Sequence, residues 1–216
     1  MKTVIIDYGS GNLKSAEKST LRAARDAGLD MDVIVTSSPK EVLSADRIIL
    51  PGVGAFADCM RGLKSLDGMI DALEEAVLTQ KKPFLGICVG MQLLADAGLE
   101  HGRTEGLGWI NGTVEMIKVS DPKLKVPHMG WNNLDLVSDH TVLNGIESGE
   151  HAYFVHSYHF KTANHTNTLA HVDYSTKITA MIGRDNIIGT QFHPEKSQSL
   201  GLKLLENFLK WSPQHD

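Results

Sequence analysis

Short, almost fully apolar runs alternate with helix-forming segments through the N-terminal half of the chain. The apolar runs predict strands at 3–6, 31–35, 47–50 and 83–87, and the segments between them predict helices at 12–27, 56–80 and 89–97. Continuous apolar strands that alternate with helices favour a parallel sheet covered by helices on both faces.

The pattern changes after Gly98, where helical spacing almost disappears. Short β-rich segments separated by turn residues predict mostly antiparallel strands that continue the sheet or are appended to it. These strands are predicted at 113–119, 152–155, 158–161, 168–172, 178–182 and 187–191. An amphipathic run over 200–209 predicts a C-terminal helix that begins near Ser197 or Ser199. With no repeat or long linker, the chain is predicted to form one α/β domain over 1–216 with a mixed sheet.

Composition and charge exclude several classes of protein. The chain has 216 residues, 42% of them hydrophobic, a formal net charge of -5, and two cysteines, Cys59 and Cys88. This length can bury a stable core without disulfides, and so few cysteines are typical of a reduced cytosolic protein. Acidic and basic residues are mixed, so no basic stripe is available for a nucleic acid. No apolar run is long enough for a signal peptide or a membrane span, which predicts a cytoplasmic protein.

Cys88 stands where a predicted strand meets a predicted helix, inside the glycine frame Gly86-Ile87-Cys88-Val89-Gly90. This is the pattern of a nucleophile elbow, in which a sharp turn projects a nucleophile from the end of a strand. The start of the following helix favours a thiolate, and the backbone N–H of Val89 can donate to an oxyanion. The alternative is a small buried core residue, and the frame alone leaves both interpretations open.

His193 has a distinctive context among ten histidines, in Gln191-Phe192-His193-Pro194-Glu195. Pro194 favours an extended His193, and residues i and i+2 of an extended segment face the same way. His193 and Glu195 are therefore predicted to project together, so that the carboxylate orients the imidazole toward a thiol. A loop histidine beside a solvated glutamate is the alternative, but the presence of Cys88 favours a catalytic pair.

Two glycine-containing loops carry weaker signals. The loop 51–54, with the sequence Pro-Gly-Val-Gly, follows a predicted strand and can present backbone N–H groups to an oxyanion, although it also fits a simple turn. The turn 9–12 lacks the spacing of a phosphate-binding loop, which favours a plain tight turn.

Histidines and a tryptophan in the C-terminal half raise two further questions. His151, His156 and His159 lie close in sequence, but no carboxylate or second thiol stands at a ligand spacing. A structural or surface role is therefore favoured over a metal site. Trp131, in a predicted loop with polar neighbours, is either an interface residue or a core residue under that loop.

Together these segments resemble the class I, or triad-type, glutamine amidotransferases. The cysteine elbow at 86–92 and the segment 193–195 carry the resemblance to the whole family. Blocks at 7–13, 51–56, 128–132, 153–158 and 193–197 are similar to the branch that supplies ammonia to histidine biosynthesis. The blocks cover nearly the whole chain. The resemblance implies a flavodoxin-like fold, with helices on both faces of a mixed central sheet and an antiparallel-rich C-terminal half.

The resemblance implies hydrolysis of glutamine to glutamate and ammonia through a cysteine thioester. It implies Cys88 as the nucleophile, His193 as the general acid and base, and Glu195 as the residue that orients His193. The positions that it implies for the oxyanion and for glutamine are Gly52, Val89, Gln92, Glu100, Ser157 and Tyr158.

The resemblance also implies a partner. Ammonia is expected to pass to a HisF-type (β/α)8-barrel cyclase subunit, in a heterodimer that makes imidazole glycerol phosphate and an aminoimidazole carboxamide ribotide. Asn12, Trp131 and Lys196 match positions expected near that interface, and no cofactor or metal is expected. Three alternatives remain: the glutaminase subunit of another ammonia-channelling synthase, such as that of pyridoxal phosphate synthesis, a free-standing cysteine hydrolase, or a non-catalytic flavodoxin-like module.

Overall fold

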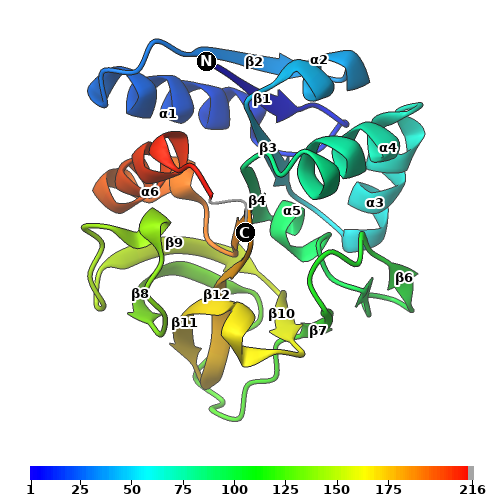
Figure 1. The fold of residues 1–216 in the computed structure, drawn as a ribbon. Coiled ribbons are helices and arrows are strands. Elements are labelled where there is room, and N and C mark those ends of the chain that lie inside the picture. The colour runs from blue at the N-terminus through cyan, green and yellow to red at the C-terminus, as the bar shows by residue number, and fades with distance from the viewer. Residues whose placement is uncertain (214–216) are drawn as a thin grey trace.

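A nine-stranded sheet runs through the computed structural model, which describes residues 1–213 (Figure 1). Its strands stand in the order β2-β1-β3-β4-β13-β12-β11-β8-β9. Their bounds are β1 (Lys2–Ile6), β2 (Asp32–Thr36), β3 (Arg47–Gly52), β4 (Phe84–Cys88), β8 (His128–Leu136), β9 (His151–His156), β11 (Thr168–Tyr174), β12 (Thr176–Arg184) and β13 (Ile187–Thr190). Neighbours from β2 to β13 are parallel, which defines the parallel half. Neighbours from β13 to β9 are antiparallel, and β12, β11, β8 and β9 form the antiparallel half.

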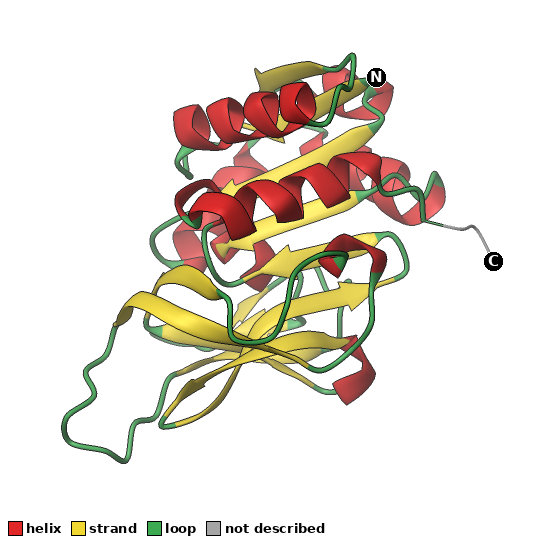
Figure 2. Cartoon of the chain, turned by 90° about the vertical axis from the view of Figure 1, so that its left-hand side faces the viewer, coloured by secondary structure: helices red, strands yellow, loops and turns green. Residues whose placement is uncertain are grey.

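Helices cover both faces of the parallel half (Figure 1, Figure 2). On one face α1 (Leu13–Asp26) and α6 (Gln198–Lys210) lie side by side, and on the other lie α3 (Phe56–Ser65) and α4 (Met69–Glu74). The shorter helical elements are α2 (Pro39–Ser44), the π-helical turn η1 (Glu75–Thr79) and α5 (Val89–Gln92). This arrangement confirms the predicted mixed sheet with helices on both faces.

A smaller sheet of four strands packs against the antiparallel half through β10 and β12. Its strands, in spatial order, are β10 (Tyr158–Thr162), β7 (Gly112–Met116), β5 (Ala97–Gly98) and β6 (Thr104–Glu105). The described residues also form three 3-10 turns: η2 (Thr141–Leu143), η3 (His165–Asn167) and η4 (Pro194–Lys196). In the described part of the chain, no helix has both the length and the apolar character needed to cross a bilayer.

Burial differs between the two halves of the main sheet. Every residue of β3 and β4 is buried, because helices cover both faces there, and this agrees with their continuous apolar runs. Along β8 buried and exposed positions are interspersed, and Met129 and Trp131 are exposed. The buried apolar side chains of both halves nevertheless form one continuous cluster.

The prediction of one continuous helix over 56–80 is wrong, because the structure has separate helical elements there. α3 ends at Ser65, and α4 begins at Met69 after Gly68, whose φ of 73° is left-handed. Glycine adopts this conformation without the clash that a Cβ causes, so the chain can change direction between the two helices.

The helix predicted over 89–97 ends at Gln92, because the residues after it bond to distant parts of the chain. The N–H of Asp96 donates to the Gly112 carbonyl at 3.0 Å, and the Asp96 carboxylate accepts from the Gly112 N–H at 2.9 Å. Ala97 and Gly98 then pair with β7 as strand β5. These bonds replace the i to i−4 bonds that a longer helix needs.

The segment around Trp131, predicted as a loop, is the nine-residue strand β8. It pairs with β9 over 128–133 and with β11 over 134–136. Antiparallel strands can leave one face open to solvent, so polar positions such as Asn132 and Asn133 are compatible with a strand but conceal it in the sequence. Neither β8 nor α2 is among the predicted elements.

Candidate active site

Cys88 lies at the carboxyl end of β4 and is the residue directly before α5. Its backbone is left-handed and strained, with φ 54° and ψ −112°. The flanking glycines serve a different purpose, since neither has positive φ. A Cβ on Gly90 would lie 1.8 Å from the Leu50 carbonyl oxygen, and one on Gly86 would lie 2.7 Å from the Gly90 oxygen. The glycine frame therefore lets α5 lie directly against β3 and β4.

The short α5 changes one expectation about the elbow. With four residues, it has a much smaller dipole than the longer helix predicted at this position. The N–H of Val89, at the first helical position, is one of those that a helix does not use internally, and it lies next to the thiol. Stabilisation of charge on Cys88 therefore depends mainly on side chains and single N–H groups around it.

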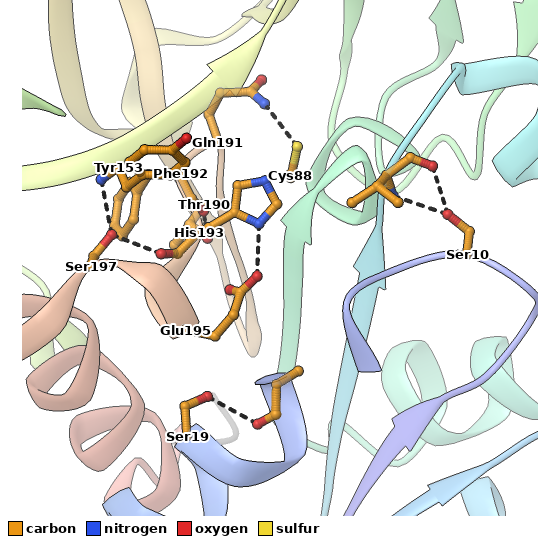
Figure 3. Close-up of polar contacts among 12 residues, drawn as sticks. Ser10, Ser19, Cys88, Tyr153, Thr190, Gln191, Phe192, His193, Glu195 and Ser197 are labelled. Carbon is orange, nitrogen blue, oxygen red and sulfur yellow. Dashed lines mark hydrogen bonds and ion pairs between the residues drawn. The ribbon is translucent and has the colours of Figure 1, made fainter. Parts of the chain in front are cut away.

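His193 reaches Cys88 from the neighbouring parallel strand. β13 pairs with β4, with Thr190 beside Ile87, and the chain leaves β13 toward the same edge of the sheet at which β4 ends. His193 Nδ1 bonds to Glu195 Oε1 at 2.8 Å, and the imidazole lies beside Cys88 (Figure 3). His193 Nε2 is buried and has no hydrogen-bond partner within residues 1–213. A buried ring nitrogen without a partner, beside a thiol, is free to exchange a proton with that thiol or with a substrate.

His193 is extended as predicted, with φ −96° and ψ 101°, but Glu195 is not part of an extended segment. Pro194 begins the 3-10 turn η4, so Glu195 lies in a tight turn and its carboxylate folds back to the ring. Ser197 Oγ donates to the His193 carbonyl at 2.7 Å and accepts from the Tyr153 N–H at 3.0 Å, which fixes this turn against β9 (Figure 3).

The surroundings of His193 keep its ring protonated at neutral pH. Burial alone lowers the pKa of His193, but the nearby Cys88 sulfur and the hydrogen-bonded carboxylate of Glu195 outweigh burial and raise it to about 9. The side chains of His193 and Glu195 are only 2% and 3% exposed, so solvent screens this interaction weakly. An imidazolium beside a cysteine favours the thiolate, the nucleophilic form of the side chain.

A cavity of about 310 Å³ opens over Cys88. Several residues that the sequence analysis assigns to the active site line this cavity. The parallel half supplies one wall, with Cys88, His193 and neighbouring loops. The antiparallel half and the start of β10 supply the opposite wall. The lining residues are Val53, Gly54, Cys88, Val89, Gln92, Glu100, Pro127, Val155, His156, Ser157, Tyr158 and His193.

The predicted substrate residues occupy different positions around this cavity. Glu100 accepts the N–H of Phe56 through Oε2 at 2.9 Å, and Gln92 donates to the Tyr158 carbonyl at 3.0 Å. Gly52 is not part of the lining, but it pairs with Cys88 in the sheet. A Cβ at Gly52 would lie 2.6 Å from the Tyr8 hydroxyl and 2.7 Å from the Gly90 nitrogen, so Gly52 permits the close packing of β3 on the elbow.

Two polar residues beside the cavity have no role in the sequence analysis. Gln191 donates to Cys88 Sγ at 3.7 Å, and Ser10 Oγ accepts the N–H of Val53 at 3.0 Å and donates to its carbonyl at 2.7 Å (Figure 3). In this structure the Val53 N–H is thus engaged by Ser10 and does not face the cavity. Gln191 lies two residues before His193, in the same sequence motif. That position is the only feature of the sequence that could have indicated a place for Gln191 in the active site.

Of the predicted interface residues, Trp131 and Lys196 lie on one surface, joined by Tyr153. The Trp131 ring packs edge-on against Tyr153 at 5.8 Å, and Lys196 Nζ lies 5.6 Å from the Tyr153 ring centroid. Trp131 is 47% exposed, which excludes the core alternative. Asn12, partly buried, directly precedes α1, which packs against η4 and α6.

The three clustered histidines have separate environments. His151 is exposed, His159 is partly buried, and His156 is buried with its Nδ1 bonded to the Tyr158 carbonyl at 2.9 Å. His156 Nε2 meets His128 Nδ1 at 3.0 Å, and burial lowers the pKa of His156 to about 3. Within the residues that the structure describes, no three His, Cys, Asp or Glu side chains converge in a way that could hold a metal ion.

The fold and this site define a class of protein. The family model "Glutamine amidotransferase class-I" matches residues 4–211. The chain therefore belongs to the class I glutamine amidotransferase family, as its sequence motifs predict.

Comparison with curated relatives shows which members of this family the chain is similar to. The chain is 61% identical over 214 residues to "Imidazole glycerol phosphate synthase subunit HisH" of Rhodospirillum rubrum, with 99% of this chain and 100% of the relative covered. It is 57% identical over 213 residues to the protein of the same name from Cereibacter sphaeroides, with the same coverage.

Solved structures agree on the fold. A glutamine amidotransferase crystal structure matches with a TM-score of 0.70 at 16% identity, covering 96% of this chain and 97% of that one. A glutamine amidotransferase from Thermotoga maritima matches with a TM-score of 0.64 at 17% identity, covering 97% and 96%. At such identities the likeness concerns the fold alone, and it confirms the predicted α/β class.

Proposed function

We propose that this chain hydrolyses glutamine to glutamate and ammonia and delivers the ammonia to a cyclase subunit that makes imidazole glycerol phosphate in histidine biosynthesis. The observation that carries the proposal is the meeting of Cys88 and His193 at the wall of one cavity, with Glu195 bonded to His193 Nδ1 at 2.8 Å. A thiol beside a protonated imidazole that a carboxylate orients is an arrangement for acyl transfer. The names of the relatives from Rhodospirillum rubrum and Cereibacter sphaeroides support the pathway.

In the first half of the reaction, the Cys88 thiolate attacks the side-chain amide carbon of glutamine. A C–S bond forms and the carbonyl electron pair moves to oxygen. The proposed donors to that oxygen are the Val89 N–H and, once Ser10 releases it, the Val53 N–H next to Gly52. His193 then gives its proton to the leaving nitrogen, the C–N bond breaks, and ammonia departs. The product on the enzyme is a γ-glutamyl thioester.

In the second half, His193 acts as the base. It takes a proton from water, the water oxygen attacks the thioester carbon, and the C–S bond breaks to restore the Cys88 thiolate and release glutamate. Glu195 holds His193 Nδ1 throughout, so that Nε2 serves both proton transfers.

The far wall of the cavity is proposed to hold the substrate. Glutamine carries an α-amino and an α-carboxylate group, which require partners of both kinds. Glu100 offers a carboxylate to the ammonium group, while Ser157 and the Tyr158 segment offer backbone and hydroxyl groups across from Cys88. Gln92, buried between them, uses its amide N–H groups within the protein and leaves its oxygen for the ligand.

The partner is proposed to dock on the surface that carries Trp131, Tyr153 and Lys196, with Asn12 nearby. Met129 is 62% exposed and lies two residues from Trp131 on the same side of β8. Exposed methionine and tryptophan beside a partly buried tyrosine are residue types enriched at the centre of a protein interface. A HisF-type barrel cyclase on this surface would sit next to η4, the turn that holds His193 and Glu195 together.

The test is glutamate release by the complex with the barrel cyclase and its nucleotide ligand. Cys88→Ala and His193→Ala are expected to lower turnover at least about a thousandfold, because each removes a group that acts in both chemical steps. Cys59→Ala is the matched control, and it should retain turnover within about threefold because that thiol is on α3, buried against Ser10.

Turnover retained in Cys88→Ala would exclude the thioester mechanism. A wild-type chain that responds to the synthase of another pathway, and not to the cyclase, would exclude the proposed partner.

A further inference from the structure

Gln191 is fully buried directly after β13, and its side chain lies between two residues of the active site. Its Nε2 donates to Cys88 Sγ at 3.7 Å, and its Oε1 accepts from Gln92 Nε2 at 3.0 Å (Figure 3). Its own backbone N–H donates to the Ala180 carbonyl at 2.8 Å, which fixes the start of the side chain. The mechanism above gives this residue no task.

The orientation of the Gln191 amide follows from its neighbours. The Tyr158 carbonyl oxygen can only accept, so the Gln92 atom 3.0 Å from it must be the amide nitrogen. That same nitrogen reaches Gln191, so the Gln191 atom facing it must be the oxygen. The nitrogen of Gln191 therefore faces the sulfur. A flip of either amide would place donor against donor or acceptor against acceptor in a buried site, at a cost of about 1–3 kcal/mol per unpaired group.

The Tyr158 carbonyl is itself held in place. His156 Nδ1 bonds to it at 2.9 Å, so two donors converge on one oxygen. Because that carbonyl is an acceptor, Nδ1 carries the proton, and the neutral His156 ring accepts at Nε2 from His128. The direction of every hydrogen bond from His128 to Cys88 is thus determined by one backbone carbonyl.

We propose that Gln191 is a catalytic residue that donates an N–H hydrogen bond to the Cys88 thiolate. The inference rests on the proposed function, because it concerns the same nucleophile. In the free enzyme the bond favours the anionic sulfur. In the thioester the sulfur is neutral and a weak acceptor, so the bond regains its strength as the C–S bond breaks and the thiolate departs. Gln191 thereby assists the second half of the reaction as well as preparing the first.

Several titratable groups face Cys88, and a pH experiment must take them into account. His193 approaches from the end of β13, Tyr8 from the turn after β1, and Cys59 from α3. Glu100 and His156 lie across the cavity. None of them is altered by a substitution at Gln191, so differences between variants report on the amide.

The decisive measurement is the rate of Cys88 alkylation by iodoacetamide against pH on the full chain, with the modified peptide identified by mass spectrometry. Gln191→Met keeps the length of the side chain and removes the donor. Its profile is expected to move to higher pH by roughly one unit, about a tenfold loss of thiolate at pH values below the midpoint. The plateau rate at high pH should stay equal or rise, because a less stabilised thiolate is more nucleophilic.

Two further variants separate hydrogen bonding from packing. Gln191→Glu keeps an oxygen for Gln92 and places a second oxygen against the sulfur, so its midpoint should move further than that of Gln191→Met. Gln92→Met leaves Gln191 intact but removes the hydrogen bond that orients the Gln191 amide. The alkylation midpoint is expected to move in the same direction by a smaller amount.

Asn207→Leu is the matched control. It removes a side-chain amide that donates to the Val142 and Asn144 carbonyls, far from the nucleophile, and its alkylation midpoint should stay within about 0.2 pH units of wild type.

The outcomes separate this proposal from the proposed function. Midpoints unchanged in both Gln191 variants, whatever happens to the plateau, would overturn the proposal even if the complex hydrolyses glutamine. Shifted midpoints would support the hydrogen bond even if the wild-type complex releases no glutamate, a result that would count against the proposed function alone. In the active complex, Gln191→Met should lower kcat/KM about tenfold at pH 7 with little change in KM, and the deficit should narrow toward pH 8.5.

Discussion

The parallel and antiparallel halves of the main sheet contribute to the active site in different ways. In the parallel half, β4 and β13 lie side by side and end at the same edge, so Cys88 and His193 meet there although they are far apart in sequence. The antiparallel half supplies part of the opposite wall through Val155 and His156 of β9, and it has an open face on β8. The difference shows that the buried parallel half holds the reacting side chains in fixed positions. The partly exposed antiparallel half has surface residues that can contact substrate or a partner protein. Its consequences can be tested by substitutions in each half.

The parallel half is expected to lose much of its stability when a single methyl group is added at the elbow. In Gly90→Ala the new Cβ would fall 1.8 Å from the Leu50 carbonyl, a backbone atom that cannot move without disturbing β3 and β4. We expect a loss of about 3 kcal/mol or more in the free energy of unfolding. Urea unfolding followed by circular dichroism measures it.

Gly9→Ala is the control for this prediction. Gly9 has a left-handed φ of 82°, but nothing lies within 4 Å of an added Cβ, so only the backbone conformation is penalised. The expected loss is about 1–2 kcal/mol. Equal losses in both variants would contradict the conclusion that close packing, and not backbone conformation, demands Gly90.

The open face of the antiparallel half is expected to matter for binding more than for folding. Trp131→Ala should weaken the complex with the barrel cyclase by about 2 kcal/mol, roughly thirtyfold in Kd, because exposed tryptophan is a frequent interface anchor. The variant chain alone should unfold within about 1 kcal/mol of wild type. Calorimetric titration and urea unfolding measure the two quantities.

Met116→Ala serves as the comparison for Trp131. Met116 is 54% exposed on β7, in the smaller sheet, and its loss should leave the affinity for the cyclase unchanged. If Met116→Ala and Trp131→Ala weaken binding equally, the β8 face is not the interface.

The two halves should also respond to opposite extremes of pH. The raised pKa of His193, about 9, exceeds the ordinary value of 6.5, so its contribution to stability is complete below pH 6.5 and is lost as pH rises through 9. Burial lowers the pKa of His128 to about 4, so His128 costs stability as pH falls from 6.5 toward 4. The free energy of unfolding should therefore decrease toward both acidic and alkaline pH. His128 contributes to the decrease on the acid limb of this profile, and His193 contributes to the decrease on the alkaline limb.

Single substitutions should flatten one limb each. His193→Gln should reduce the alkaline slope, and His128→Phe, which keeps a ring stacked against Phe154 and Tyr174, should reduce the acid slope. Each slope should change by up to about 1.4 kcal/mol per pH unit, the value for one proton. Urea midpoints from pH 4 to 9.5 measure the effect, and a variant that flattens the opposite limb would refute the assignment.

The same contrast explains how much of the fold could be predicted from the sequence. The parallel strands were predictable because burial on both faces demands continuous apolar runs, a local signal. β8 was not, because its polar residues are compatible with a strand only once β9 and β11 are in place. The early end of α5 has a similar cause, since the bonds of Asp96 to Gly112 join segments that no local pattern relates.

The active site was predictable to the extent that its residues carry characteristic chemistry. Cys88 and the His193 segment combine reactive side chains with unusual flanking residues. Gln191 has an amide that is common in many roles, and its task depends on which atoms of Gln92 and Cys88 surround it. Only the arrangement of those neighbours reveals the direction in which the amide points.

β13 has a consequence for how the protein is made. It is the last strand along the chain, yet it occupies the middle of the sheet, between β4 and β12. A ribosome must therefore synthesise the chain beyond residue 190 before β4 acquires its second neighbour, and until then the inner edges of both halves are open. Such late, long-range closure slows folding and exposes strand edges to other chains. The histidine that completes the catalytic group, His193, comes shortly after this strand, so a nascent chain cannot cleave glutamine before its sheet can close.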